Sequence, residues 1–257
     1  MPGNSSVYTL GYSVDFTTLA AQNLLTGGSG AKTIDGKTWT LENAANATTA
    51  YINDGTHAGL YLRSNSTSSY IDAGTYTAPS LHTSFKNLVS AIAPGQYESA
   101  WVLFQFTMPH TPDAFFNAAQ MGITSSLAGF TSTNRATLIL YRAFNPYDSS
   151  NLQYTASHYI SGATQSASNN YVSPNVAHDV FAVRFTTSGM VELYWGDSVA
   201  GAFPALSALV FFTRFMTAGY SIERIDWSGW DVLAAISSYN TAGNTDLLLS
   251  KLAVYYK

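Results

Sequence analysis

Hydrophobic and polar residues alternate along this chain in short runs, and few segments keep a helical period. Apolar residues at every second position are typical of β-strands with one buried face. The runs are rich in β-branched and aromatic residues and end at glycine, proline, asparagine, aspartate or serine, which favours turns. The strongest runs cover residues 101–106, 135–141, 180–185, 190–195, 221–227 and 247–256.

The two runs on either side of Gly189 give the best local signal. In the first run Phe181, Val183 and Phe185 share one face, and in the second Val191, Leu193 and Trp195 do so. A period of two on both sides of a glycine-ended turn predicts an antiparallel hairpin. Arg184 and Glu192 fall on the polar faces, and we expect them to pair across the strands.

Weaker signals complete the secondary structure. Residues 8–16 and 59–63 read as strands, Asp35-Gly36 as a tight turn that opens a strand up to Leu41, and 157–174 as an exposed loop with an embedded strand. A helical turn is expected at 19–25, and the only short helix candidates are 110–121 and 231–238. No repeat or composition break divides the chain, so we expect one domain of residues 1–257, with 1–10 as a candidate extended arm.

Many strands, little helix and a length above 200 residues favour a β-sandwich or barrel. We expect an all-β, two-sheet antiparallel β-sandwich (a jelly roll) with few short helices. The apolar stretch 203–216 is shorter than the roughly 20 residues that cross a bilayer. Residues 208–212 within it are either core or subunit interface, and core is favoured.

Composition and charge exclude several classes of function. The chain has no cysteine, a net charge of −4 and only 10% charged residues. These values exclude disulfide scaffolds and thiolate metal sites and argue against nucleic-acid binding. The five histidines lie far apart, and no Gly-x-Ser-x-Gly or phosphate-binding glycine loop occurs. We therefore expect no metal, no cofactor and no nucleic-acid or membrane partner. No signal peptide is visible, so synthesis in the cytoplasm is expected.

Particular segments resemble the concanavalin A-like lectin/glucanase superfamily, which includes laminin G-like jelly-roll modules. They are the hairpin Val180–Phe185, Ser188-Gly189 and Val191–Asp197, and the closing strand Asp246–Tyr256. Near the N-terminus, Val14–Phe16, Ile34–Trp39 and Gly59–Leu62 look like the opening of such modules in bacteriophage virion proteins. The resemblance implies a fold, and fold alone does not imply function.

The resemblance also raises the question of catalysis. Glucanases of this superfamily carry catalytic carboxylates on one strand as Glu-x-Asp-x-x-Glu. The nearest match here is Glu223 and Asp226, whose spacing of three puts them on opposite strand faces, and the third acid is missing. We therefore expect no catalytic residues and no enzyme activity. Loops of the superfamily sometimes hold calcium, and 53–55 and 178–179 are the candidates, although solvated turns are the favoured reading.

Two clusters of aromatic and acidic residues are candidate carbohydrate-binding sites. The first contains Asp226, Trp227, Trp230 and Asp231, and the second contains Tyr194, Trp195 and Asp197. Sugar rings pack on aromatic faces while carboxylates accept their hydroxyl protons. The alternative is that Trp195 and Trp227 are core residues and that the acids lie in turns.

The expected function is a non-enzymatic structural module on a bacteriophage virion, either a capsid-decoration, fibre or tail protein. Its low charge and its many Tyr, Ser, Thr and Asn residues suit adaptable polar contacts with aromatic anchors. The expected partners are other virion subunits, copies of itself in a homo-oligomer, or cell-surface glycans. The alternatives are a free, extracellular carbohydrate-binding lectin and a divergent glycan hydrolase.

Overall fold

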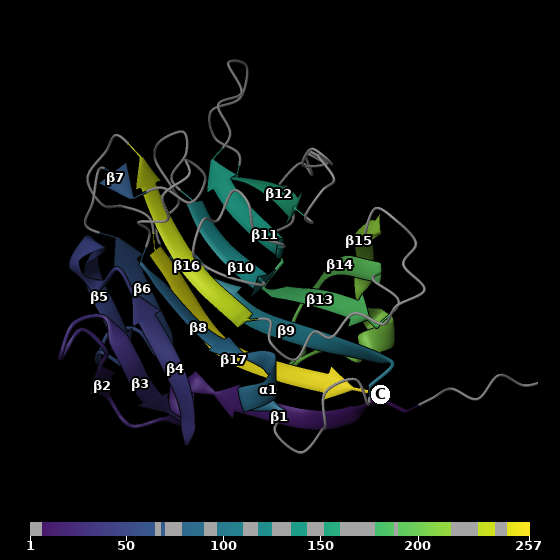
Figure 1. The fold of residues 1–257 in the computed structure, drawn as a ribbon, viewed down its shortest axis with the longest axis horizontal. Coiled ribbons are helices and arrows are strands. Elements are labelled where there is room, and N and C mark those ends of the chain that lie inside the picture. The colour runs from purple at the N-terminus through teal and green to yellow at the C-terminus, as the bar shows by residue number, and fades with distance from the viewer. Residues whose placement is uncertain are drawn as a thin grey trace, which may run out of the picture.

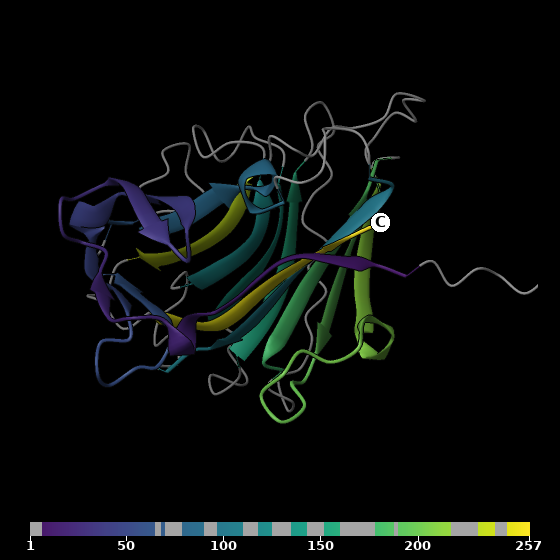
Figure 2. The ribbon, with the colours of Figure 1, turned by 90° about the horizontal axis from the view of Figure 1, so that it is seen from below.

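The protein folds into two antiparallel β-sheets, named sheet A and sheet B here (Figure 1). The computed structural model describes residues 7–64, 68–69, 79–89, 97–109, 118–124, 135–142, 152–159, 178–187, 190–216, 231–239 and 246–257. In Figure 2 strands β16 and β17 lie one above the other in the two different sheets. The expected all-β sandwich with few helices is confirmed.

Among the described residues, sheet A has nine strands in the order β15-β14-β13-β9-β17-β6-β5-β2, and β1 also pairs with β17. Their bounds are Val210–Met216 (β15), Met190–Gly196 (β14), Val180–Thr186 (β13), Ser99–Thr107 (β9), Asp246–Tyr256 (β17), Leu60–Ser64 (β6), Ala47–Ile52 (β5), Gln22–Asn23 (β2) and Thr9–Asp15 (β1).

In the part of the chain that the structure describes, sheet B has eight strands in the order β12-β11-β10-β16-β8-β4-β3, and β7 also pairs with β16. Their bounds are Leu152–Tyr159 (β12), Arg135–Arg142 (β11), Ala118–Thr124 (β10), Asp231–Tyr239 (β16), Ser80–Ser84 (β8), Lys37–Glu42 (β4), Gly30–Ile34 (β3) and Ser68–Ser69 (β7). The described helices are short: α1 (Phe85–Leu88) and the 3-10 turns η1 (Phe16–Thr18), η2 (Ala44–Asn46) and η3 (Leu206–Ala208). No helix among the described residues is long and apolar enough to cross a membrane.

The long strand β17 organises sheet A. One of its edges pairs with β9, and the other pairs first with β6 and then with β1. Figure 2 shows β1 running beside β17. The strand expected at residues 247–256 is therefore confirmed, and it lies inside the sheet rather than at its edge.

The predicted hairpin around residue 189 is confirmed as β13 and β14. Phe181 lies opposite Trp195 and Val183 opposite Leu193. Arg184 lies opposite Glu192, and the expected ion pair forms, with Arg184 Nη1 2.7 Å from Glu192 Oε2. The alternating pattern therefore places both the core face and the charged pair correctly.

The tight turn expected at Asp35-Gly36 joins β3 to β4. Both residues have positive φ, 49° for Asp35 and 68° for Gly36. Two successive positive φ values define the two-residue hairpin turn whose twist matches that of the flanking strands. This turn sets the register of the β3–β4 pair, in which Ile34 lies opposite Lys37.

The main core fills the space between the two sheets. Phe104 of β9 and Phe181 of β13 are almost fully buried there, and their rings stack with centroids 6.1 Å apart. Leu41 of β4 and Leu81 of β8 close the core from sheet B. Burial of large apolar side chains between two layers is the main source of stability in a sandwich.

A second apolar cluster lies on the other side of sheet A. Trp101, Val180, Ala182 and Leu209 are buried in it, and the segment 197–209 contributes partly buried side chains such as Phe203. The outer face of sheet A is therefore also covered where β9, β13 and β17 meet, which the alternating pattern of β13 does not predict.

The helix expected at 231–238 is wrong, and the one expected at 110–121 is wrong over the residues that the structure describes. Residues 231–238 form most of β16, which pairs with β10 and β8 in the middle of sheet B. Residues 118–121 of the expected helix 110–121 belong to β10, and 110–117 lie outside the described residues. The expected helical turn at 19–25 contains the short strand β2. In each case long-range pairing overrides a weak local helical pattern.

The expectation that residues 208–212 are core is wrong in part. Leu209 is buried, but Val210 and Phe211 on β15 are about half exposed. The strand expected at 221–227 lies outside the described residues.

Candidate functional site

Three chemically active side chains meet on the outer face of sheet B. On neighbouring strands β8 and β16, Leu81 and Val232 are buried in the core. Because successive side chains of a strand point to opposite faces, His82 and Asp231 point outward. Glu42, at the end of β4, follows the buried Leu41 and so lies on the same outer face. We call Glu42, His82, Asp231 and Ser80 the sheet B site.

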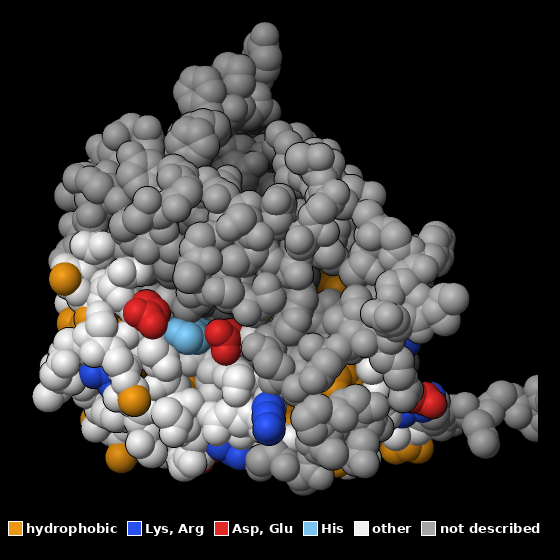
Figure 3. All heavy atoms as spheres, in the orientation of Figure 1, with side chains coloured by type: hydrophobic (Ala, Val, Ile, Leu, Met, Phe, Trp, Pro, Cys, Tyr) orange, Lys and Arg blue, Asp and Glu red, His pale blue; other side chains and the backbone are white. Residues whose placement is uncertain are grey.

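The histidine of this site lies between two carboxylates. His82 Nδ1 is 3.2 Å from Asp231 Oδ2, and its Nε2 is 3.7 Å from Glu42 Oε1. The exposed fractions of the side chains are 15% for His82, 20% for Asp231 and 43% for Glu42. The space-filling view shows a histidine with an acidic side chain on either side on this face (Figure 3). The site is therefore partly open, and its carboxylates are within reach of a ligand.

Buried polar atoms in the sheet B site lack hydrogen-bond partners among the described residues. They are Ser80 Oγ and both ring nitrogens of His82, whose contacts with the carboxylates do not have hydrogen-bond geometry. Ser80 is fully buried and lies opposite Glu42 in the β4–β8 register. Buried polar atoms are normally hydrogen-bonded, so these atoms indicate a place for a polar ligand or for water.

Hydrogen-bond acceptors predominate in the sheet B site, because two of its side chains are carboxylates. Carboxylates only accept hydrogen bonds, whereas an imidazole can donate or accept. The carboxylates face different nitrogens of the ring, so the three groups do not converge on one point. In keeping with this, the described residues contain no group of three or more side chains that could hold a metal ion.

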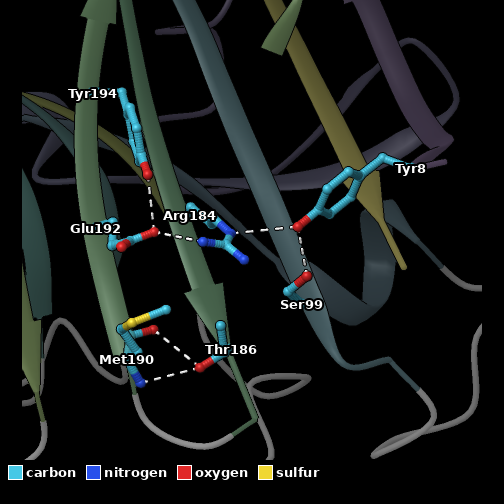
Figure 4. Close-up of polar contacts among 7 residues, drawn as sticks. All are labelled: Tyr8, Ser99, Arg184, Thr186, Met190, Glu192 and Tyr194. Atoms are coloured by element: carbon cyan, nitrogen blue, oxygen red, sulfur yellow. Dashed lines mark hydrogen bonds and ion pairs between the residues drawn. The ribbon is translucent and has the colours of Figure 1, made fainter. Parts of the chain in front are cut away.

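A second polar cluster lies on the outer face of sheet A (Figure 4). Arg184 Nη1 and the Tyr194 hydroxyl both donate to Glu192 Oε2, at 2.7 and 2.9 Å. Arg184 Nε also donates to the Tyr8 hydroxyl at 3.3 Å, which in turn lies 2.7 Å from Ser99 Oγ. The cluster ties β13 and β14 to β9 and to the segment that leads into β1.

Burial assigns a structural role to this second cluster. The Glu192 side chain is 1% exposed and that of Arg184 is 28% exposed. Burial and the hydrogen bond to Glu192 raise the pKa of Tyr194, so its hydroxyl stays a donor. For Tyr8, burial opposes ionisation, but hydrogen bonds with Ser99 and Arg184 outweigh it and lower its pKa. The charged groups are thus already satisfied by one another.

The structure separates the residues of the predicted cluster around residue 195. Tyr194 points to the outer face of sheet A, whereas Trp195 lies on the core side and stacks on Phe212 with centroids 4.5 Å apart. Asp197 Oδ1 lies 3.1 Å from His178 Nδ1, and the His178 ring stacks on Trp195. Tyr194 and Asp197 therefore do not form one binding surface.

Only Asp231 of the other predicted cluster can be placed. It joins the sheet B site, while Asp226, Trp227 and Trp230 lie outside the described residues, as does Glu223. Sequence reasoning missed Glu42 and His82. The available signal was the alternation in Ser80–Ser84, which puts His82 on the face opposite the buried Leu81.

The two turns considered for calcium have structural contacts. Asp54 accepts hydrogen bonds from the backbone N–H groups of Thr56 and His57, at 2.8 and 2.6 Å. Asp179 accepts hydrogen bonds from the backbone N–H and the hydroxyl of Ser198, at 2.7 and 2.6 Å. Asp54 thus holds its own loop in place, and Asp179 ties the residues before β13 to those after β14.

Comparisons with known proteins identify the fold. No family model and no curated protein matches the chain. Among solved structures, a variant of alginate lyase A1-II' is 13% identical, over 85% of this chain and 94% of that one, with a TM-score of 0.50. The carbohydrate recognition domain of Emp47p is 9% identical over 99% of both chains, with a TM-score of 0.43. The Bacillus licheniformis β-glucanase is 10% identical over 96% of this chain and 97% of that one, with a TM-score of 0.42.

At such identities the similarity shows the fold alone. The two antiparallel sheets and the likeness to the lyase confirm a concanavalin A-like jelly roll. The activity of the chain must be argued from its own residues.

Proposed function

We propose that this protein is a non-enzymatic, lectin-like module that binds glycans on the outer face of sheet B. The observation that carries the proposal is a set of buried polar atoms, in His82 and Ser80, that make no hydrogen bond within the described part of the chain and lie beside two partly exposed carboxylates. Sugar hydroxyls both donate and accept hydrogen bonds, so they complement carboxylates, an imidazole and a serine hydroxyl together.

The arrangement favours binding over cleavage. Retaining glycosidases place two carboxyl groups about 5–5.5 Å apart on either side of the scissile bond. Here the His82 ring lies between Glu42 and Asp231 and contacts both. The space that a glycosidic bond would need between the carboxylates is therefore occupied by a side chain.

A glycan array followed by titration calorimetry tests the proposal. We expect His82→Ala to weaken the binding of array hits about tenfold, because hydrogen bonds that involve charged groups contribute about 1.5–3 kcal/mol. His57→Ala is the matched control, since His57 contacts Asp54 on a distant loop. Release of reducing ends or of unsaturated sugars from any bound glycan would refute the non-enzymatic role, and equal binding by both variants would refute the site.

We also propose a virion surface as the setting, with other virion subunits or further copies of the chain as partners. The low charge and the resemblance of residues 14–16, 34–39 and 59–62 to the opening of phage modules support this setting. Peptide mass spectrometry of purified phage particles, with antibody labelling of their surface, provides the test. A protein that is secreted as a free monomer and is missing from particles would favour the free lectin instead.

A further inference from the structure

We propose that the ligand of the sheet B site is a glycan that carries protonated amino groups, such as a polymer of 2-amino-2-deoxy sugars. This inference rests on the proposed glycan-binding function and adds the chemical class of the ligand. It separates the protein from binders of neutral glycans and from binders of polyuronates.

Charge is the first argument. Glu42 and Asp231 each carry a negative charge, and the imidazole of His82 adds at most one positive charge, so the site is net negative in either state of the ring. Within the described part of the chain, no lysine or arginine lies within ion-pair distance of either carboxylate. A uronate would be repelled, whereas an ammonium group would be attracted.

The sheet B site differs from the other ion pairs among the described residues in how its carboxylates are partnered. In three of them a lysine or arginine partners a carboxylate, namely Arg184–Glu192, Lys251–Asp15 and Lys257–Glu98. His57 and His178 each contact one carboxylate. Among the described residues only His82 is shared by two carboxylates, which leaves acceptor capacity on both of them.

The hydrogen-bonding groups of the sheet B site also favour an ammonium ligand. An ammonium group has three donors and no acceptor, and carboxylates have acceptors and no donor. Ser80 supplies an independent indication, because its fully buried Oγ has no partner among the described residues and lies opposite Glu42 in the register. Its side chain shares the outer face with His82, two positions along β8, so a donor-rich group at Glu42 would also be within the range of this hydroxyl.

Partial burial raises the strength of the interaction. Asp231 is 20% and His82 15% exposed, so these groups are screened less than fully solvated charges. Glu42 is 43% exposed and leaves the site accessible from solvent. We therefore expect the amine-bearing glycan to bind at least about tenfold more tightly than its N-acetylated counterpart.

Calorimetry on the full chain with three oligosaccharides of equal length tests the inference. The probes are a glucosamine oligomer, the same oligomer fully N-acetylated, and a mannuronate oligomer, at a pH where the amines are protonated. Glu42→Gln and Asp231→Asn should each weaken glucosamine binding about tenfold. Glu98→Gln, which removes an exposed carboxylate elsewhere, should leave it unchanged. Added salt should lower the affinity of the unmodified protein, a result that does not depend on how the variants fold.

The outcomes separate this inference from the proposed function. Equal or tighter binding of the N-acetylated or mannuronate oligomer, lost in His82→Ala, would overturn the inference and leave glycan binding in place. Glucosamine binding that survives both charge substitutions would also overturn it. Absence of binding to these oligomers and to a glycan array would refute the proposed function itself.

Discussion

The buried ion pair on sheet A allows a quantitative prediction, because its two partners differ in exposure. Glu192 is 1% exposed and Arg184 is 28% exposed. Replacing Arg184 by methionine keeps an unbranched apolar side chain beside Trp101 but leaves the Glu192 carboxylate buried without its cation. Breaking a buried pair in this way costs about 3–5 kcal/mol. The remaining hydrogen bond from Tyr194 places the expected cost of Arg184→Met near the lower end, about 3 kcal/mol.

The reverse substitution should be milder. In Glu192→Gln, Arg184 keeps its charge but remains partly hydrated, and the amide oxygen still accepts hydrogen bonds from Arg184 and Tyr194. We expect a loss of about 1 kcal/mol. The double variant leaves no buried charge, so it should be more stable than Arg184→Met alone, by an amount that a double-mutant cycle measures.

Urea unfolding followed by tryptophan fluorescence measures these free energies of unfolding. For a chain of this size each kcal/mol corresponds to about 2–4 °C in the melting temperature, so Arg184→Met should lower it by about 6–12 °C. Equal costs for the two single substitutions, or a double variant that is less stable than Arg184→Met, would refute the argument from burial.

Two further predictions concern backbone space and pH. Gly59 has a φ of +136°, and a Cβ there would lie 2.6 Å from the Leu249 carbonyl oxygen, so Gly59→Ala should lower the free energy of unfolding by about 2 kcal/mol or more. Gly36 has a φ of +68° and open space around it, so Gly36→Ala should lower the free energy of unfolding by only about 1 kcal/mol. Equal losses for the two variants in urea unfolding would contradict the close approach of Gly59 to the Leu249 carbonyl. Burial opposes ionisation of Asp15, but hydrogen bonds from Thr17 and Lys251 outweigh it and lower its pKa. The ionised Asp15 therefore stabilises the fold above the ordinary carboxyl pKa of 3.8, and this contribution is lost as the pH falls through the pKa of the folded state. The free energy of unfolding of Asp15→Asn, measured in urea, should thus approach that of the unmodified protein on acidification. A difference between the two proteins that stays constant with pH would contradict this.

Local patterns predict those parts of the fold in which strand period and turn chemistry agree. The hairpin of β13 and β14 and the turn at Asp35-Gly36 are examples, because each is specified by contiguous residues. The strand β16 was expected to be a helix, since its pairing with β10 and β8 is invisible in its own sequence. Burial of Ala182 beneath the segment 197–209 was missed for the same reason.

The candidate site was harder to predict from the sequence than the fold. Asp231 was identified by its acidic and aromatic neighbours in the sequence, but its actual partners are remote in the chain. His82 and Glu42 come from β8 and β4 and reach Asp231 only through the strand order of sheet B. A single histidine in Ser80–Ser84 carries no chemical signal until that order is known.

The position of β17 has a consequence for how the chain reaches its native state. Thr9 lies opposite Tyr256, and Leu60 lies opposite Leu249, so sheet A depends on contacts between segments at very large sequence separation. Such high contact order slows folding to the range of milliseconds to seconds. Until residues 246–256 insert, β9, β6 and β1 each present an open edge that can pair with another chain. We therefore expect aggregation during refolding to depend steeply on protein concentration, and to be governed by the insertion of this one strand.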